Sequence, residues 1–285
     1  MSGMGEALSS WIGRSETRTD IMSADVLTRL AATLDHDRAR VQDGDIAVPL
    51  AHWLHFLPDT RQSGLGADGH PERGGFLPPV HHLPRRMWAG SRLTFPGDIR
   101  AGMTVERVST ITNVKEKTGS AGDLVFVTVR HAFSEPGGPV LVTDEHDIVY
   151  RSMAGPAVTP APSAPPPGTW SRSLVPDAVL LFRYSALTFN GHRIHYDRDY
   201  VTREEGYPGL VVHGPLTATL LIDLVGRELP GARISAFSFR ARSPLFDGNR
   251  MVLNGEPPDA EGRIRLWATN HEGGLAMEAE ATVSG

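Results

Sequence analysis

Cysteine, a basic excess and long apolar runs are all missing from this sequence. With no cysteine among 285 residues, the chain has no disulfide, no thiol nucleophile and no cysteine ligand for zinc or an iron–sulfur cluster. Its 28 basic and 33 acidic side chains give a net charge of −5, whereas nucleic-acid-binding proteins usually carry a basic excess. No apolar run approaches the roughly 20 residues that cross a membrane, and the first residues lack the basic flank and apolar core of a secretory signal. We therefore expect a cytoplasmic protein that binds neither nucleic acid nor a membrane.

A proline-rich segment divides the chain into two parts. Six of the twelve residues from Pro156 to Pro167 are proline. Such a run neither pairs in a sheet nor continues a helix, so we expect an extended spacer over residues 153–169. The flanking segments, 1–152 and 170–285, are each large enough for a core of their own. The sequence therefore predicts two domains.

Both segments show helical periodicity followed by strand-like patterns. Apolar residues at helical spacing predict helices that begin after Ser23 and at Pro215, with a further short helix at 49–56. Alternating or apolar runs predict strands over residues 91–95, 103–114, 124–133, 140–150, 234–242, 250–253, 263–270 and 275–283. Strands segregated from helices indicate an α+β fold rather than a βαβ dinucleotide-binding fold. The shared element order, with similar spacing of apolar residues around Gly102 and Gly248, favours two copies of one fold.

Two motifs in the long loop of residues 58–85 are interpreted as having no chemical role. Residues 64–69 read Gly-Leu-Gly-Ala-Asp-Gly, which matches G-x-G-x-x-G. Dinucleotide binding needs a strand before this motif and a helix after it, and neither is predicted here. We interpret the segment as a flexible loop, and His81 and His82 as a solvated pair.

The residues that could carry chemistry are concentrated in the segment 184–216. Its first part holds five polar candidates within ten positions: Asn190, His192, His195, Asp197 and Asp199. A histidine can act as a general acid or base near neutral pH, so His195 is a catalytic candidate. It could instead be a structural histidine that bonds a backbone carbonyl, or a metal ligand together with His192 and the two aspartates.

The second part of this segment, His213-Gly214-Pro215, opens the long predicted helix. Pro215 suits the first helical position, and Gly214 lets a ligand approach the backbone closely. The free amides and the dipole at this helix end would stabilise an oxyanion, such as the enolate oxygen of a thioester. The alternative is an ordinary strand-to-helix turn.

Two blocks of this segment resemble one enzyme family. The first block is Thr-Phe-Asn-Gly-His-Arg-Ile-His-Tyr-Asp at 188–197, and the second is Val-His-Gly-Pro-Leu at 212–216. They resemble the MaoC-like (R)-specific enoyl-CoA hydratases of the hot-dog fold. Within that family they are similar to the branch of mesaconyl-CoA hydratases and mitochondrial-type 3-hydroxyacyl-thioester dehydratases. Segments 74–80 and 85–90 extend the resemblance into the first half of the chain.

The resemblance implies a double hot-dog fold and a hydro-lyase reaction. Two antiparallel sheets would each wrap a long helix, with catalysis in 170–285 and the acyl pocket assisted by 1–152. The implied reaction is reversible hydration of an α,β-unsaturated acyl-CoA, with a CoA thioester as partner and neither a metal nor a redox cofactor. Two hot-dog units in one chain can cover each other's sheet edges. The resemblance to the family also implies a homodimer.

The resemblance also implies roles for individual residues. His195 occupies the position of the family's catalytic histidine, and the Gly214 amide that of the oxyanion donor. Asn190 stands where the family has a catalytic aspartate, and an amide cannot abstract a proton. Either Asn190 only orients the water and His195 acts alone, which we favour, or His192 or Asp197 supplies the second group.

Further residues are expected to bind the substrate. Arg193 and Arg86 are candidates for an acidic group, because a guanidinium binds carboxylates and phosphates in a bidentate manner. His192, His213 and Tyr184 belong to the two blocks or adjoin them, and we expect them to line the site.

Two other functions are compatible with the sequence. A hot-dog acyl-CoA thioesterase would use the same helix end, but such enzymes usually carry a carboxylate on the helix face, where this helix offers only Asp223 and Glu228. A non-catalytic acyl-CoA-binding module is the other alternative, because Asn190 replaces the aspartate. The products distinguish the three: a hydratase keeps the thioester, a thioesterase releases a free thiol, and a binding module changes nothing.

Overall fold

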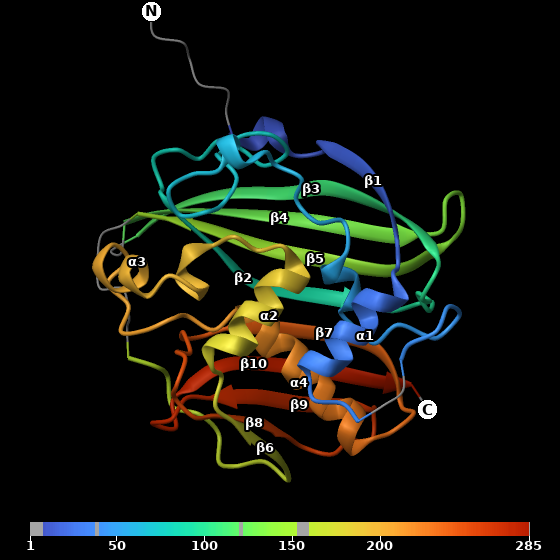
Figure 1. Cartoon of the computed structure of the whole chain (residues 1–285). Helices are drawn as coiled ribbons and strands as arrows, with labels where there is room; N and C mark the ends of the chain where they lie inside the picture. Colours follow the sequence, from blue (N-terminus) through green and yellow to red (C-terminus); the bar gives the residue numbers. More distant parts are fainter. Residues whose placement is uncertain (1–7, 38–39, 120–121, 153–159, 285) are drawn as a thin grey trace, which may run out of the picture.

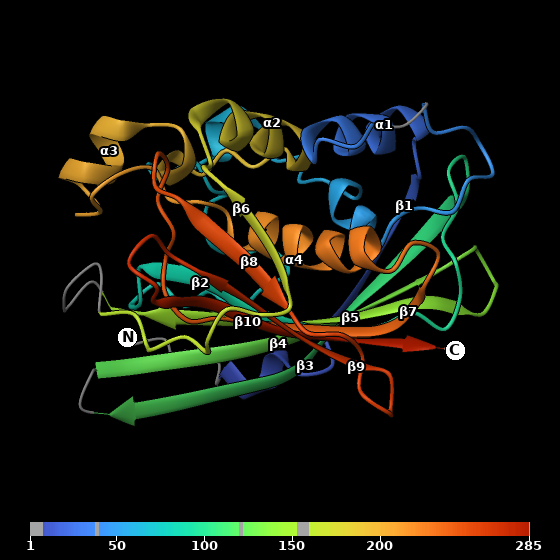
Figure 2. The ribbon, with the colours of Figure 1, turned by 90° about the horizontal axis from the view of Figure 1, so that it is seen from below.

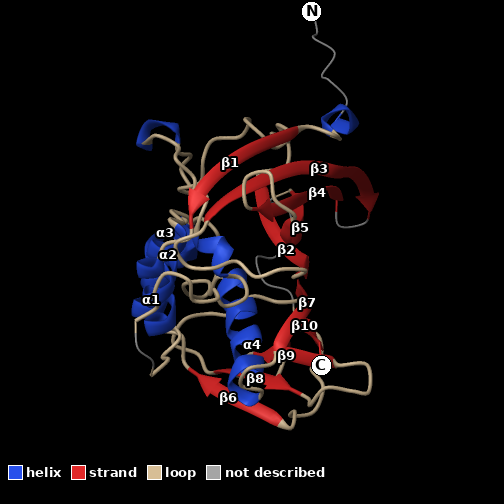
Figure 3. Cartoon of the chain, turned by 90° about the vertical axis from the view of Figure 1, so that its right-hand side faces the viewer, coloured by secondary structure: helices blue, strands red, loops and turns tan. Residues whose placement is uncertain are grey.

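Ten antiparallel strands form a single sheet in the computed structural model, which describes residues 8–37, 40–119, 122–152 and 160–284 (Figure 1). The strand order is β1-β3-β4-β5-β2-β7-β10-β9-β8-β6. The helices α1 to α4 all lie on one face of this sheet (Figures 2 and 3). The α+β class predicted from the sequence is confirmed.

The two halves of the sheet consist of equivalent strands in equivalent order. The first half contains η1 (Leu8–Trp11), β1 (Ser15–Ile21), α1 (Ala24–Thr33), η2 (Ala51–Leu54), η3 (Gln62–Gly64), β2 (Arg85–Thr94), β3 (Thr104–Gly119), β4 (Gly122–Ser134) and β5 (Val140–Arg151). The second half contains β6 (Trp170–Leu174), α2 (Ala178–Thr188), η4 (Arg193–His195), α3 (Arg198–Arg203), α4 (Gly214–Glu228), β7 (Arg233–Ala241), β8 (Met251–Gly255), β9 (Arg263–Thr269) and β10 (Leu275–Ser284). Read from the middle of the sheet outward, the first half is β2-β5-β4-β3-β1 and the second is β7-β10-β9-β8-β6. This correspondence supports the inference that one fold occurs twice.

The strands β2 and β7 join the halves and correct one prediction. They pair antiparallel, with Leu93 opposite Phe237 and Ser91 opposite Phe239. The two sheets predicted from the sequence are therefore one continuous sheet, because the edge strand of each half satisfies the backbone groups of the other. Sequence patterns define strands but do not show which edges pair.

The helix α4 forms the centre of the largest hydrophobic core. Nine of its fifteen residues are buried, and it lies between the sheet and the layer formed by α1 and α2 (Figure 2). Leu216, Leu220 and Leu224 pack with residues of both halves, including Leu30 from α1 and Phe237 from β7. This packing fixes the N-terminus of α4 relative to both halves of the chain.

The first half lacks a long helix in the region that the structure describes, which corrects a second prediction. Residues 49–56, predicted as helical, form only the short 3₁₀ turn η2. Leu50 and Phe56, on either side of this turn, have φ angles of 68° and 55°, and both values are left-handed conformations that end a right-handed helix. The helix α1, which Ser23 caps as predicted, has only ten residues.

The part of the proline-rich segment within the described residues contacts the sheet, which corrects a third prediction. Ser163 forms an isolated β-bridge with Gly274, and the Leu275 amide donates to the Pro162 carbonyl at 2.8 Å. A proline has no amide hydrogen but keeps its carbonyl acceptor, so the segment does pair locally. Residues 153–159, the first part of the predicted spacer, lie outside the described residues.

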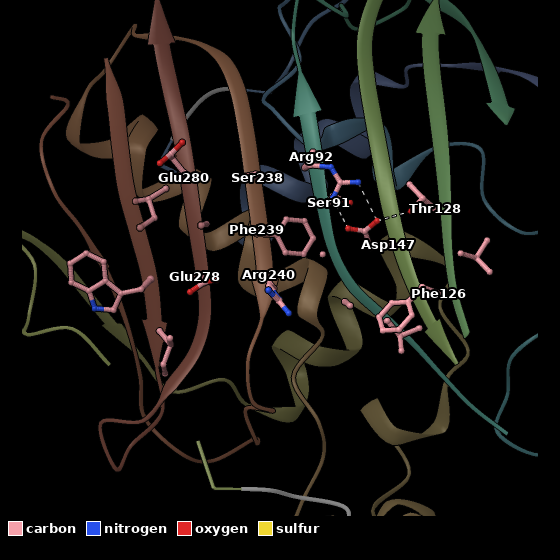
Figure 4. A pocket seen from close by; sticks show the side chains of 18 of the residues that line it. Ser91, Arg92, Phe126, Thr128, Asp147, Ser238, Phe239, Arg240, Glu278 and Glu280 are labelled. Atoms are coloured by element: carbon pink, nitrogen blue, oxygen red, sulfur yellow. Dashed lines mark hydrogen bonds and ion pairs between the residues drawn. The ribbon is translucent and has the colours of Figure 1, made fainter. Parts of the chain in front are cut away.

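The sheet face opposite the helices carries a hollow of about 750 Å³ across the junction of β2 and β7. Figure 4 shows Arg92 bonded to Asp147, which also accepts a hydrogen bond from Thr128 at 3.0 Å. Arg240 and Glu278 line its other side. None of the predicted site residues lines this hollow. Among the described helices, none is long and apolar enough to span a membrane.

Candidate active site

A cavity of about 820 Å³ lies on the helical side, between the two halves of the chain. The second half contributes Tyr184, Ser185, Asn190 and His213 to its lining, and the first half contributes the half-buried Trp53 and Trp88 together with His70. Aromatic side chains with large exposed fractions, Phe182 at 66% and Phe189 at 64%, lie among the remaining lining residues. The cavity therefore extends from an exposed aromatic rim to a pair of indoles.

His195 ends the turn η4 and is only 7% exposed. Its Nδ1 donates to the Val211 carbonyl at 2.7 Å, which leaves Nε2 as the basic nitrogen of the ring. Burial lowers the pKa of His195 to about 3, against the opposing effect of the Val211 hydrogen bond. The ring is therefore neutral at physiological pH and able to accept a proton.

His213 stacks on His195 at the start of α4. The ring centroids are 3.6 Å apart and the planes differ by 19°. Nε2 of His213 bonds the Ser185 hydroxyl at 2.8 Å, and its buried Nδ1 has no partner among the described residues. Burial lowers the pKa of His213 well below its ordinary value, and the His195 charge adds to that effect. The two rings form a stacked neutral pair that holds His195 in place.

Gly214 follows as the first residue of α4. Within the described part of the chain no hydrogen-bond acceptor is assigned to its amide, since the first bond of the helix runs from Thr217 to His213 at 3.1 Å. A Cβ at Gly214 would meet no atom within 4 Å. The space beside the Gly214 Cα is therefore open, and the positive end of the helix dipole lies at this residue. Gly214 is not itself among the residues that line the cavity, but its neighbours His213 and Pro215 are.

Asn190 follows α2, which ends at Phe189 in a left-handed conformation with φ of 47°. Its Oδ1 accepts a hydrogen bond from the His192 amide at 3.0 Å, so the side chain is fixed by its own loop. Asn190 is itself among the residues that line the cavity. It can donate to a bound water but cannot take a proton from it.

The charged residues of the first block bind one another instead of forming a metal site. Asp197 pairs with Arg193 at 2.7 Å and caps α3 through the Tyr200 amide at 3.0 Å. These hydrogen bonds, that from Tyr200 first and those from Arg193 next, lower the pKa of Asp197. Asp199 is exposed on α3. The possible ligand set of His192, His195, Asp197 and Asp199 is therefore not brought together.

The two arginine candidates differ in their surroundings. Arg193 is held by Asp197, by the Ala67 carbonyl at 2.9 Å and by the Tyr200 ring at 4.2 Å. Arg86 lines a second, smaller hollow of about 420 Å³ beside the main cavity. Among the residues that the structure describes, no carboxylate forms an ion pair with the Arg86 guanidinium, which lies near the Tyr150 hydroxyl.

The glycine-rich loop at 64–69 is a fixed part of the site, which corrects the interpretation of it as flexible. The Arg193 amide donates to the Asp68 carbonyl at 2.9 Å. Gly69 has a φ of 86°, and a Cβ there would lie 2.0 Å from the Gly191 carbonyl oxygen. Only glycine permits this approach, which places the next residue, His70, with its ring centroid 4.0 Å from that of His192.

One trio of side chains in this loop region has the spacing of a metal site. The potential ligand atoms of Asp68, His70 and His192 all lie within 4.8 Å of one another. However, Oδ2 of Asp68 already bonds Nδ1 of His70 at 3.1 Å. This direct contact makes Asp68 and His70 a hydrogen-bonded pair, and we assign no metal here.

Comparison with known proteins decides the family. Residues 50–247 match the model of the family described as hydroxyacyl-thioester dehydratase type 2. The chain is 44% identical to the mesaconyl-C(4)-CoA hydratase of Chloroflexus aurantiacus, over 97% of this chain and 98% of that protein. The chain belongs to the hydroxyacyl-thioester dehydratase type 2 family. It is also 26% identical to the mitochondrial hydroxyacyl-thioester dehydratase type 2 of Schizosaccharomyces pombe, over 70% of this chain and 74% of that protein.

Solved structures support the fold. A MaoC-like dehydratase of Phytophthora capsici superposes with a TM-score of 0.69 at 13% identity, over 95% of each chain. A Mycobacterium tuberculosis protein with a double hotdog fold superposes with a TM-score of 0.63 at 13% identity, over 95% of this chain and 96% of that one. The resemblance of the two sequence blocks to MaoC-like hydro-lyases of acyl thioesters is thus confirmed.

The sequence predicted that the first half assists the acyl pocket, but it did not show that Trp53, Trp88 and His70 are among the residues that line it. Trp53 donates from Nε1 to Oδ2 of Asp144 at 2.7 Å, and its ring meets that of Trp88 edge-on at 4.8 Å. Asp144 is fully buried and also accepts from His146 at 2.8 Å and from His52 at 3.3 Å. Burial raises the pKa of Asp144, but the charge and hydrogen bond of His146 outweigh burial and lower it overall. A buried, ionised carboxylate thus orients one indole of the cavity wall.

Proposed function

We propose that this protein catalyses reversible addition of water across the α,β double bond of an acyl-CoA thioester. The observation that carries the proposal is the neutral, buried His195, with its Nδ1 bonded to Val211 and its Nε2 left as the base. Its ring stacks on that of His213, the residue that precedes Gly214 at the start of α4. Membership of the hydroxyacyl-thioester dehydratase type 2 family supports this reaction. The catalytic groups come from the second half, 170–285, and the first half, 1–152, completes the acyl cavity.

In the forward direction, Nε2 of His195 takes a proton from a water held by the NH₂ group of Asn190. The water oxygen bonds to the β-carbon, and the electrons of the double bond move onto the thioester oxygen. That oxygen accepts a hydrogen bond from the Gly214 amide at the positive end of α4, where negative charge is stabilised as it develops. A proton added at the α-carbon completes the product.

The substrate is a CoA thioester with a short acyl chain, and a mesaconyl-type acyl group is the first candidate. The Chloroflexus relative supports this choice through its name. A mesaconyl-type group carries a free carboxylate, and Arg86 is the arginine available for it, since Arg193 is bound by Asp197. His192, His213 and Tyr184 shape the site rather than bind the acyl group by charge, because His213 bonds Ser185 and Tyr184 contacts Thr219 at 3.3 Å. A homodimer stays a prediction.

The thioesterase alternative is weakened by the surroundings of Asp223 on α4. This carboxylate is nearly buried and binds His36, Arg172 and Arg227. A group committed to three cationic or ionisable partners is not free to attack a thioester or activate water. Among the described residues the face of α4 therefore offers no free carboxylate in the cavity.

The test is a panel of mesaconyl-, itaconyl-, crotonyl- and medium-chain enoyl-CoA with the wild type and His195→Ala. Loss of the conjugated enoyl absorbance is followed beside the release of free thiol. We expect loss of absorbance without thiol in the wild type, and a fall of about 10³-fold in the variant. Thiol release would support the thioesterase, and binding without turnover would support the binding module.

A further inference from the structure

Because Asn190 stands where the family has an aspartate, the catalytic segment offers no evident group for the second proton transfer. Asn190 cannot exchange a proton, and Asp197, the carboxylate nearest in sequence, is bound by Arg193 and by the amide of Tyr200. If His195 takes the proton from water, another group can deliver a proton to the α-carbon. Among the residues of the first half that line the cavity, His70 is the one with a titratable side chain.

We propose that His70, oriented by Asp68, is a second acid–base group of this site, a proposal that rests on the hydratase function above. The ring comes from the glycine-rich loop of the first half and lines the main cavity. Its side chain is 27% exposed, so it is accessible to a substrate yet shielded from bulk solvent on most sides.

The contacts of His70 are those of an oriented acid–base residue. Its Nδ1 bonds Oδ2 of Asp68 at 3.1 Å, and its backbone amide donates to the other oxygen of the same carboxylate at 3.0 Å. Burial raises the pKa of Asp68, but the side-chain and backbone hydrogen bonds from His70 lower it overall, so the carboxylate is ionised. An aspartate on Nδ1 fixes the tautomer and leaves Nε2 for chemistry.

The position of His70 couples it to the catalytic histidine. His192 is close to both, with ring centroids 4.0 Å from His70 and 5.5 Å from His195. Burial is the main cause that lowers the pKa of His195, and the charges of His192 and His70 lower it further. The two histidines His70 and His195 are therefore electrostatically coupled. The close approach of Gly69 to the Gly191 carbonyl holds this arrangement, because it fixes the loop against the catalytic segment.

His195 and His70 then account for both proton transfers of the reaction. His195 takes one proton from water as the oxygen bonds to the β-carbon, and the π electrons pass to the thioester oxygen. His70 gives its Nε2 proton to the α-carbon as the enolate returns to a thioester. The proton gained by His195 then passes to His70 through His192 or bulk water, which restores both rings. Dehydration follows the same steps in reverse.

The experiment measures kcat and KM for hydration of a thioester that the wild type accepts. The variants are His70→Gln, which keeps the size of the side chain, His70→Ala, Asp68→Asn and the control His82→Ala, an exposed histidine of the same long loop. We expect kcat to fall about 10²- to 10³-fold in both His70 variants and about 10-fold in Asp68→Asn, with KM changed less than about threefold. His82→Ala keeps the wild-type rate.

Two readouts separate an acid–base role from a structural one. Added imidazole should restore His70→Ala by about tenfold or more, and the pH profile of kcat should lose one limb in both His70 variants. A His70→Gln rate within about threefold of the wild type, or a loss with neither rescue nor a changed pH profile, would overturn the proposal. So would loss of wild-type activity on removal of divalent ions, which would make the trio a metal site. A wild type that hydrates no thioester would instead refute the hydratase function.

Discussion

The buried histidines predict a specific loss of stability in mild acid, which can be assigned to His195 by substitution. Burial holds the pKa of His195 at about 3, whereas an unfolded chain has a histidine pKa near 6.5. Below that value the unfolded state binds a proton that the folded state does not. The contribution of His195 to stability is therefore complete above pH 6.5 and is lost as the pH falls toward 3.

The magnitude follows from the size of this pKa difference. Each pH unit below about 6.5 removes about 1.4 kcal/mol for one such group. Between pH 7.5 and pH 5, His195 alone thus costs about 2 kcal/mol of unfolding free energy, and His192, with its pKa also lowered to about 3 by burial and by His70, costs a similar amount.

Urea unfolding at pH 7.5 and pH 5, followed by tryptophan fluorescence, measures this effect. His195→Asn keeps an N–H that can donate to Val211 but does not titrate, so it should lose about 2 kcal/mol less than the wild type over this interval. The control His82→Asn, at an exposed position, should behave as the wild type. Equal losses in the wild type and His195→Asn would show that His195 does not cause the acid sensitivity.

Two further substitutions test how the first half completes the site. Gly69→Ala should cost about 3 kcal/mol or more in unfolding free energy and most of the activity, because the new Cβ would meet the Gly191 carbonyl at 2.0 Å. The control Gly137→Ala, with a similar φ of 75° and no neighbour within 4 Å of the new Cβ, should cost only about 1 kcal/mol of unfolding free energy. Equal costs of the two substitutions in thermal unfolding would show that the contact between Gly69 and Gly191 does not constrain the loop. Trp53→Ala should raise the ratio of kcat/KM for an eight-carbon over a four-carbon enoyl-CoA by about tenfold or more, since removing the indole lengthens the acyl cavity. An unchanged ratio would show that Trp53 and Trp88 do not limit the chain length.

The sequence predicted those elements whose pattern follows from local burial. Strands such as β4 alternate between buried and less buried positions, which makes their period visible. The helix α4 was found because its long apolar residues recur at helical spacing in a mostly buried segment. The strands β1 and β6 were missed because they are edge strands of largely polar sequence, Ser15–Ile21 and Trp170–Leu174. The helix α2 was missed because apolar side chains such as Val179 and Phe182 occupy its exposed face, which obscures the helical period.

The sequence predicted only those site residues that lie close together along the chain. His195, Asn190 and Gly214 lie in two short blocks whose spacing carries the resemblance. The contributions of His70 and Trp53 depend on how a distant loop packs, and no local pattern records that packing. The signal for His70 was present in the glycine at position 69, whose need for a positive φ and a close backbone approach becomes evident only with Gly191 beside it.

Hydration in ¹⁸O-labelled water tests the central claim most directly. The product of a mesaconyl-type or crotonyl thioester is analysed by mass spectrometry, with the CoA-linked and free acids resolved. We expect one ¹⁸O in the β-hydroxyl group of a product that is still a CoA thioester, with the label strongly reduced in His195→Ala. Label in the carboxylate of a free acid, or no label in any product, would contradict it.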